Sequence, residues 1–296
     1  MNHFKKSGFT LVELMIVIAI IGVLSAALIA GIHKLQHIAR AARCKANLKT
    51  LFQAAQNFGT DTGRYPAAGS YEWTVRELTP QPRYHGEHAW VSWTLGGGTS
   101  WPWGSGNSST ERHGSKMSRS VYFGNAAFIS ITNGTLWELV GKDAGVYVCE
   151  AHRTEAKKVL NPQSEKVYRS YVMNHNFRWD NGNPQDPQHT DHVASKRWTH
   201  EVIMDGKAGI RCMFAELPAN DIQKTSKYAD SVLQNDEPIG FNHLLARKWV
   251  GHVVFVDGHV EGLIRPRNAS LDVLRKLTGH LCDATEIDKD IRDQMR

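Results

Sequence analysis

The sequence predicts an α+β protein in which one long N-terminal helix packs on an antiparallel β-sheet domain with long loops. An apolar segment continues into an amphipathic helical pattern over residues 9–59, and short β-prone segments separated by turn residues follow it. With 41% hydrophobic and 22% charged residues the composition is ordinary for a folded chain, which excludes disorder. Residues 60–296 are numerous enough to bury a core.

The charge distribution argues against a nucleic-acid-binding domain. The 296 residues carry a net charge of +6, but seven of the 35 basic and one of the 29 acidic residues lie in 1–60. Residues 61–296 therefore carry 28 of each, and the whole excess sits in the first fifth of the chain. No nucleic-acid partner is expected.

The first half of the predicted helix is long enough to cross a bilayer. Residues 9–32 read FTLVELMIVIAIIGVLSAALIAGI, and Glu13 is their only charge. A spanning helix needs about 20 apolar residues. The competing explanation, a secretory signal peptide, has an apolar region of about 7 to 15 residues and ends at a cleavage site. The segment is longer and continues into a helix, so it predicts a spanning or filament-buried helix.

The second half of the helix is amphipathic. At 100° per residue, one face collects apolar residues, namely Cys44, Leu48, Leu51, Phe52, Ala55 and Phe58. The run from Gly59 to Gly63 supplies turn-forming residues and a glycine cap, which predicts the end of the helix there.

Glu13 has two explanations from the residues alone. A carboxylate inside a spanning helix costs on the order of 3 kcal/mol and is usually paired and functional. Only four residues separate it from Phe9, so a chain beginning at Phe9 would let Glu13 meet the terminal ammonium of a neighbouring copy. The alternative is a carboxylate tolerated near the membrane interface.

Residues 251–264 predict a β-hairpin. Two β-prone segments flank Asp257–Gly258, a pair suited to a type I′ turn. Further strands are expected over 145–149, 168–173 and 210–216, and loops over 96–120 and 180–192.

Residues of metal-binding type gather near the predicted hairpin, at His243, His252, Asp257 and His259. They show no HExxH or paired CxxC spacing, so no metal or catalytic site is assigned and an aspartate in a tight turn beside exposed histidines is the preferred interpretation. Trp101 and Trp103 lie in a predicted loop, where they could anchor the loop or stack on sugars. A membrane-tethered surface or carbohydrate-binding module is thus an alternative function; an exported hydrolase has no supporting motif.

Four cysteines occur: Cys44, Cys149, Cys212 and Cys282. Their even number permits disulfides in an exported domain, with three connectivities. A Cys44–Cys149 bridge is one hypothesis, and buried free thiols are the other.

The N-terminal string from Lys5 to Leu14, KKSGFTLVEL, closely resembles the class III leader of type IV pilins and type II secretion pseudopilins. The resemblance implies that residues 1–8 are a leader, which a prepilin peptidase removes by cutting after Gly8. It implies N-methylation of Phe9, and pairing of Glu13 with the N-terminus of an adjacent subunit during filament assembly. A pilin-like fold is then expected, with 9–59 as the assembly helix and 60–296 as the exported domain.

Weaker similarities run further along the chain. Residues 39–49, 61–66, 145–149 and 170–174 are similar to segments of pseudopilin-like proteins of the Planctomycetes, Verrucomicrobia and Lentisphaerae lineages. Residues 254–260, VFVDGHV, resemble the core of the H-x9-DG domain associated with prepilin processing, although Arg247 stands where that name requires histidine and His243 is the nearest upstream candidate. Some pseudopilins bind calcium, but no ligands can be assigned here and no other cofactor is expected.

The resemblance implies a non-enzymatic structural subunit of a pilus-like or secretion filament. Its partners would be itself and other pilins or pseudopilins, the prepilin peptidase, the inner-membrane assembly platform and the membrane. It would cross the inner membrane once, with the leader cytoplasmic and the globular domain periplasmic or extracellular. Counting charges gives the opposite orientation, because four basic residues closely follow the apolar run and two precede it.

Overall fold

A computed structural model describes residues 11–63, 65–68, 75–76, 89–91, 128, 130–158, 167–177, 179–180, 207–219, 232–235, 237–267 and 269–295. The predicted loop over 96–120, with Trp101 and Trp103, lies outside these residues. So does the predicted loop over 180–192, except for Asp180, which belongs to a short strand. The chain divides into two compact units, Met1–Ala39 and Arg40–Arg296.

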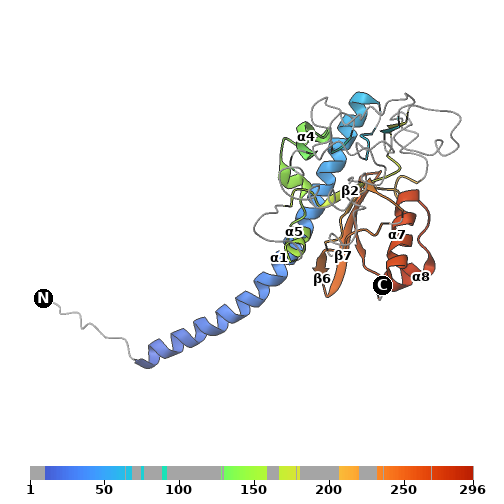
Figure 1. Ribbon diagram of the computed structural model, residues 1–296. Coiled ribbons are helices and arrows are strands. Elements are labelled where there is room, and N and C mark those ends of the chain that lie inside the picture. Colours follow the sequence, from blue (N-terminus) through green and yellow to red (C-terminus); the bar gives the residue numbers. More distant parts are fainter. Residues whose placement is uncertain are drawn as a thin grey trace. The chain divides into compact units, whose positions relative to one another are not determined.

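In the described part of the chain, the strands β2 to β8 follow one another between α5 and α7, and the helices lie before or after them (Figure 1). The helical elements are α1 Leu11–Thr62, α4 Leu136–Leu139, the 3₁₀ turn η2 Ala144–Tyr147, α5 Glu150–Ala156, α7 Leu271–Asp283 and α8 Lys289–Met295. The strands are β1 Val75–Arg76, β2 Tyr171–Asn174, β3 Trp179–Asp180, β4 Cys212–Glu216, β5 Val232–Leu233, β6 His243–Leu245, β7 Lys248–Phe255 and β8 Val260–Ile264. The predicted α+β class is confirmed.

Helix α1 ends three residues beyond the expected boundary. It continues through Gly59 to Thr62, and Gly63 follows with φ of +76° while its N–H bonds to the Gly59 carbonyl. A glycine in the left-handed conformation is the usual end of a helix because it has no Cβ to clash.

The main sheet is mixed rather than purely antiparallel. Its order is β5-β2-β4-β7-β6, with β8 also paired to β7. All these pairs are antiparallel except β2 with β5, where Met173 lies opposite Val232. The expected antiparallel sheet is therefore wrong at this edge, because β5 enters the sheet in the same direction as β2.

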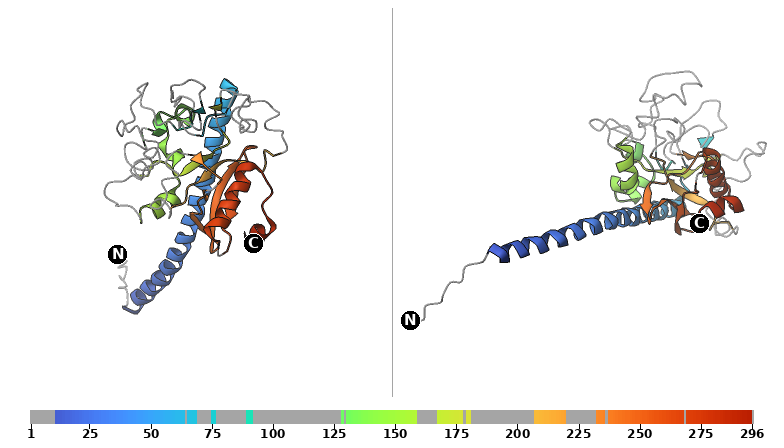
Figure 2. Two further views of the ribbon diagram at one scale, coloured as in Figure 1. Left: turned by 45° about the vertical axis from the view of Figure 1, so that its right-hand side comes forward. Right: turned by 90° about the horizontal axis from the view of Figure 1, so that it is seen from below.

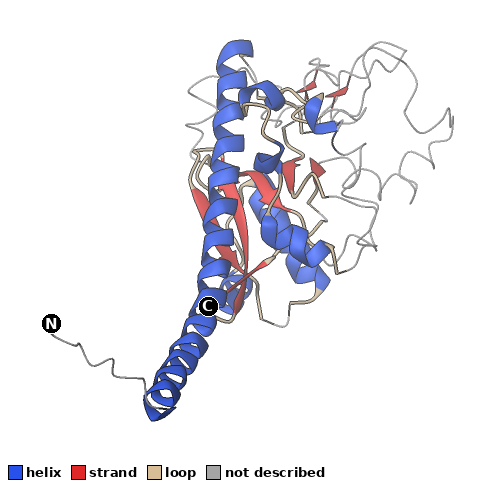
Figure 3. Ribbon diagram, turned by 90° about the vertical axis from the view of Figure 1, so that its left-hand side faces the viewer, coloured by secondary structure: helices blue, strands red, loops and turns tan. Residues whose placement is uncertain are grey.

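The second half of α1 and the helix α7 cover opposite faces of this sheet (Figures 1 and 3). Side chains alternate between the two faces along the end of β7 and the residue after it. Val254 and Val256 belong to the apolar cluster that includes α1, whereas Val253 and Phe255 belong to the cluster that includes α7. The predicted apolar face of α1 is confirmed, since Cys44, Leu48, Leu51, Phe52 and Ala55 are all buried. The right-hand view of Figure 2 shows helix α1 from one end to the other.

The hairpin of β7 and β8 is confirmed, but its predicted turn type is wrong. Gly258 has φ of +86°, whereas Asp257 does not have a positive φ. The Gly258 N–H donates to the Phe255 carbonyl, and the Phe255 N–H donates to the His259 carbonyl. This is a three-residue loop in which a type I turn precedes a glycine in the left-handed region.

The type I′ turn lies one hairpin earlier. Ala246 and Arg247, with φ of 48° and 66°, join β6 to β7 between the paired residues Leu245 and Lys248. No residue pattern predicts this turn, because alanine and arginine are not typical of positive φ.

One expected strand is absent and two are present. Residues 144–147 form the 3₁₀ turn η2, in which the Asp143 side chain caps the Gly145 N–H, so the strand expected over 145–149 is wrong. The strands expected over 168–173 and 210–216 are confirmed as β2 and β4.

Candidate functional site

The leader residues precede the described part of the chain. Gly8 and Phe9 lie outside the described residues, and Glu13 is in the first turn of α1 with its side chain exposed. Large apolar side chains around it are exposed as well: Leu11, Val12, Leu14, Met15, Ile16, Val17, Ile18, Ile20, Ile21, Val23, Leu24, Leu28, Ile32, Leu35 and Ile38. Such a continuous apolar surface marks an interaction surface for protein or membrane.

Among the residues that the structure describes, no helix is both long enough and apolar enough to cross a membrane. The expected span over residues 9–32 includes Phe9, Thr10 and several side chains near its C-terminal end that lie outside the description. The span remains a prediction.

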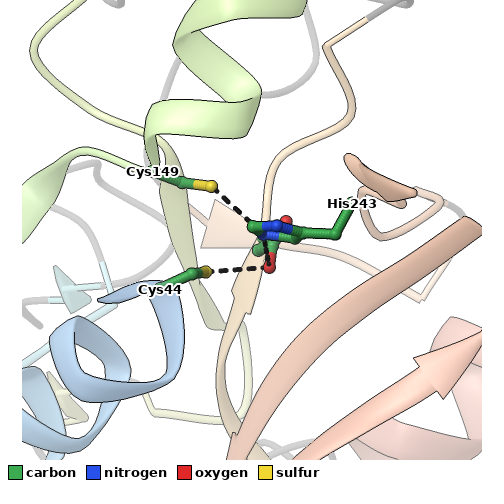
Figure 4. Close-up of side chains that lie close together, drawn as sticks. Cys44, Cys149 and His243 are labelled. Carbon is green, nitrogen blue, oxygen red and sulfur yellow. Dashed lines mark hydrogen bonds and ion pairs between the residues drawn. The ribbon is translucent and has the colours of Figure 1, made fainter. Parts of the chain in front are cut away.

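The globular unit contains a fully buried cluster of ionisable side chains (Figure 4). Cys44 comes from α1, Cys149 from the residue before α5, Glu216 from the end of β4 and His243 from the start of β6. One ligand-type atom from each residue lies within 4.8 Å of the other three. Elements far apart in sequence thus place two thiols, an imidazole and a carboxylate together.

The Glu216 carboxylate is the centre of the cluster. Its Oε1 accepts from Cys44 Sγ at 2.9 Å, His243 Nε2 at 3.1 Å and His252 Nδ1 at 2.7 Å. The His252 backbone N–H also donates to Oε1 at 3.0 Å, and the Asn242 amide donates to Oε2 at 2.9 Å. A carboxylate that accepts this many hydrogen bonds is held in one position and kept ionised.

The pKa values follow from this arrangement. Burial favours the neutral form of Glu216, but the charge of His243 and the hydrogen bonds from both histidines hold its pKa well below the usual range. Burial likewise opposes protonation of His243, yet the Glu216 charge raises its pKa to about 10. The pair is therefore an imidazolium–carboxylate ion pair at neutral pH.

The two thiols differ in acidity. Burial raises the pKa of Cys44 well above its ordinary value, and Cys149 and Glu216 raise it further. Burial also raises the pKa of Cys149, but hydrogen bonds with Cys44 and His243 lower it overall to about 7. Cys149 is consequently the more readily deprotonated of the two sulfurs, and its Sγ lies 3.3 Å from His243 Nε2.

Further groups hold the sulfurs in place. The Tyr171 hydroxyl donates to Cys44 Sγ at 3.4 Å, and the His152 backbone N–H donates to Cys149 Sγ at 3.5 Å. All four cysteines are free thiols, so the hypothetical Cys44–Cys149 partners are brought together without a disulfide. Cys212 and Cys282 form a separate buried pair, with their sulfurs 4.0 Å apart.

The histidines and aspartate named from the sequence separate into two places. His243 and His252 both contact Glu216, whereas Asp257 and His259 pair with each other at 2.6 Å in an exposed turn. Asp257 and His259 match the expected aspartate in a tight turn beside an exposed histidine. Sequence reasoning missed Glu216, although a charged residue ending the apolar strand CMFAE was a usable signal.

The comparisons with known proteins match the N-terminal segment of the chain. Residues 3–29 match the family model described as the prokaryotic N-terminal methylation motif. The matched residues include Gly8, Phe9 and Glu13. The chain therefore carries this N-terminal motif.

A curated relative agrees with this. The chain is 44% identical over 61 residues to the type IV major pilin protein PilA of Myxococcus xanthus (strain DK1622). The aligned part is 21% of this chain and spans only 28% of that pilin's length. No solved structure matches the chain. The similarity to type IV pilins therefore concerns the N-terminal segment, and the H-x9-DG resemblance of the C-terminal hairpin remains a prediction.

Proposed function

We propose that the chain is a structural subunit, a prepilin or pseudopilin, which is processed and assembled into a type IV pilus-like or type II secretion filament. The match of residues 3–29 to the N-terminal methylation motif is the observation that carries the proposal. The similarity to a type IV major pilin and the long helix α1 support it.

Processing begins with removal of the leader. A prepilin peptidase cuts after Gly8 and methylates the new N-terminus at Phe9. Such a leader implies membrane-anchored export. In the full proposal the chain crosses the inner membrane once, the leader is cytoplasmic, and the globular domain is periplasmic or extracellular until the assembly platform inserts the subunit into the filament with other pilins.

The N-terminal helix surface has to be covered both before and after assembly. The large apolar side chains of residues 11–38 are exposed in the single chain, Leu11 by 75% and Val23 by 71%. Moving one such side chain from water into an apolar environment is worth about 1.5 to 3 kcal/mol, so the helix is stable only in lipid or packed against other helices. A filament in which neighbouring helices pack together removes this surface from water and lipid.

Glu13 gives the packed helices their register. It is the only charge between residues 9 and 32, and burial without a partner would cost on the order of 3 kcal/mol. The ammonium of Phe9 in an adjacent subunit is a partner of opposite charge. Their pairing satisfies both groups and rejects registers in which a charge is left buried alone.

The substitution Glu13→Gln tests the proposal because glutamine keeps the shape and removes the charge. Filament incorporation, measured as the sheared, pelletable fraction, is expected to be lost while the subunit accumulates in the membrane. The matched control is Glu138→Gln, an exposed glutamate of α4 that pairs with Lys142, and it should assemble normally. Normal assembly of the Glu13 variant would contradict the proposal and favour a tethered binding module, which needs no such pairing.

A further inference from the structure

We propose that Cys44, Cys149, Glu216 and His243 bind one zinc ion in tetrahedral coordination, and that this ion fixes the amphipathic half of α1 to the sheet. The inference concerns the globular unit and does not depend on filament assembly. It rests on the position, burial and chemistry of four side chains.

The donor atoms are the types that zinc prefers. Structural zinc sites use cysteine sulfur, histidine nitrogen and carboxylate oxygen, and are closed and four-coordinate. All four side chains are buried, Cys44 and Cys149 to 1% exposure, His243 to 2% and Glu216 completely. Three of the four donors are anionic when they ligate, and buried anions that converge need a cation to compensate their charge.

The spacing of the donors fits a tetrahedron. With zinc–ligand bonds of about 2.0 to 2.3 Å, neighbouring ligand atoms lie about 3.3 to 3.8 Å apart. The observed separations are 2.9 Å for Cys44 Sγ to Glu216 Oε1, 3.3 Å for Cys149 Sγ to His243 Nε2, and 3.1 Å for His243 Nε2 to Glu216 Oε1. A zinc ion would move these donor pairs apart by up to a few tenths of an ångström, and all four donor atoms already lie within 4.8 Å of one another.

Neighbouring groups are placed to orient the ligands. His252 and Asn242 donate to the two oxygens of Glu216, and the Tyr171 hydroxyl donates to Cys44 Sγ. Such supporting hydrogen bonds fix metal ligands, and losing one typically weakens metal binding 10- to 100-fold. The Nδ1 atom of His243 is buried without a hydrogen-bond partner among the described residues, so only its Nε2 is directed at the donor set.

Zinc binding releases three protons. Two come from the thiols of Cys44 and Cys149, which form hydrogen bonds within the cluster when no metal is bound, and one comes from His243 Nε2. Cys44 Sγ and Cys149 Sγ become thiolates, and His243 Nε2 gives up its proton and binds the metal through its lone pair. Glu216 is already ionised. No electron is transferred, so the step needs no oxidant or reductant.

The mature full-length chain, reduced and purified in mild detergent, tests the site. After incubation with zinc and removal of the excess, it should retain about one zinc per chain. Cobalt(II) in place of zinc should give the sulfur-to-cobalt charge-transfer band and the intense visible bands of a tetrahedral site. Because this spectrum is recorded on the unmodified protein, it needs no variant to fold.

Variants then assign the ligands. Cys149→Ala and His243→Ala should each lose the retained zinc, whereas Cys212→Ala, which removes an equally buried thiol outside the cluster, should keep it. Tyr171→Phe should retain a weakened site, about 10-fold lower in affinity. A chelator should lower the melting temperature of the unmodified protein and leave that of Cys149→Ala unchanged.

Three results would overturn the inference. The unmodified chain could retain no zinc and give no tetrahedral cobalt spectrum. Retained zinc could be unaffected in both the Cys149 and the His243 variants. Mass spectrometry of the non-reduced chain from its native membrane could show a Cys44–Cys149 disulfide, which would occupy both sulfurs. A failure of filament assembly would change none of these readouts.

Discussion

The substitution Gly258→Ala, at the tip of the β7–β8 hairpin, measures how closely the hairpin packs on α1. Two separate costs are expected. The residue has φ of +86°, which costs a residue with a Cβ about 1 to 2 kcal/mol. An added Cβ would also approach Phe52 Cε1 to 2.4 Å, and overpacking of this kind typically costs about 1 to 3 kcal/mol. The free energy of unfolding should therefore fall by about 2 to 5 kcal/mol in total.

A matched control separates the two costs. Gly63 at the end of α1 has φ of +76°, but an added Cβ there would meet none of the described residues within 4 Å. Gly63→Ala should therefore show the backbone cost alone. Urea denaturation of the mature chain in mild detergent, followed by tryptophan fluorescence, measures both variants. Equal losses for the two variants, within about 0.5 kcal/mol, would refute close packing of the hairpin tip on Phe52.

Three further predictions concern the globular unit. Replacing Ala246–Arg247 by Asn-Gly should raise the free energy of unfolding by about 1 kcal/mol, because both positions have positive φ; urea denaturation showing no gain would argue against a type I′ turn. Leu48→Ala should cost about 2 to 5 kcal/mol in the same assay, whereas Leu35→Ala on the exposed part of α1 should cost nearly nothing, and equal costs would contradict the assigned burial. Burial lowers the pKa of His152 to about 4 from 6.5, so the folded state binds fewer protons than the unfolded state between these values. Stability of the metal-free chain should accordingly fall by on the order of 3 kcal/mol as pH drops from 6.5 to 4, and His152→Gln should flatten this part of the profile.

The helix and the hairpin were predictable because their signals are local. The period of apolar residues from Cys44 to Ala55 defines the buried face of α1, and Asp257–Gly258 marks a reversal between two β-prone segments. The detailed turn was not predictable, since a glycine between two strands is compatible with several loop lengths. Only the register of Val254 with Val260 distinguishes them.

The buried cluster was beyond sequence reasoning for a different reason. Its four residues are separated by 105, 67 and 27 positions, so no spacing motif connects them. The fold joins them because α1 crosses the sheet where β4 ends and β6 begins. The strand predicted over residues 145–149 was wrong because of a local hydrogen bond. The Asp143 side chain accepts from the Gly145 N–H, and this bond stabilises the 3₁₀ turn η2 instead of a strand.

The mature N-terminus is the most direct test of the central proposal that this chain is a processed filament subunit. Mass spectrometry of the protein isolated from its native membrane should find a chain that begins at Phe9 and carries one additional N-terminal methyl group. A chain that still begins at Met1, or one cut anywhere other than after Gly8, would contradict the proposal.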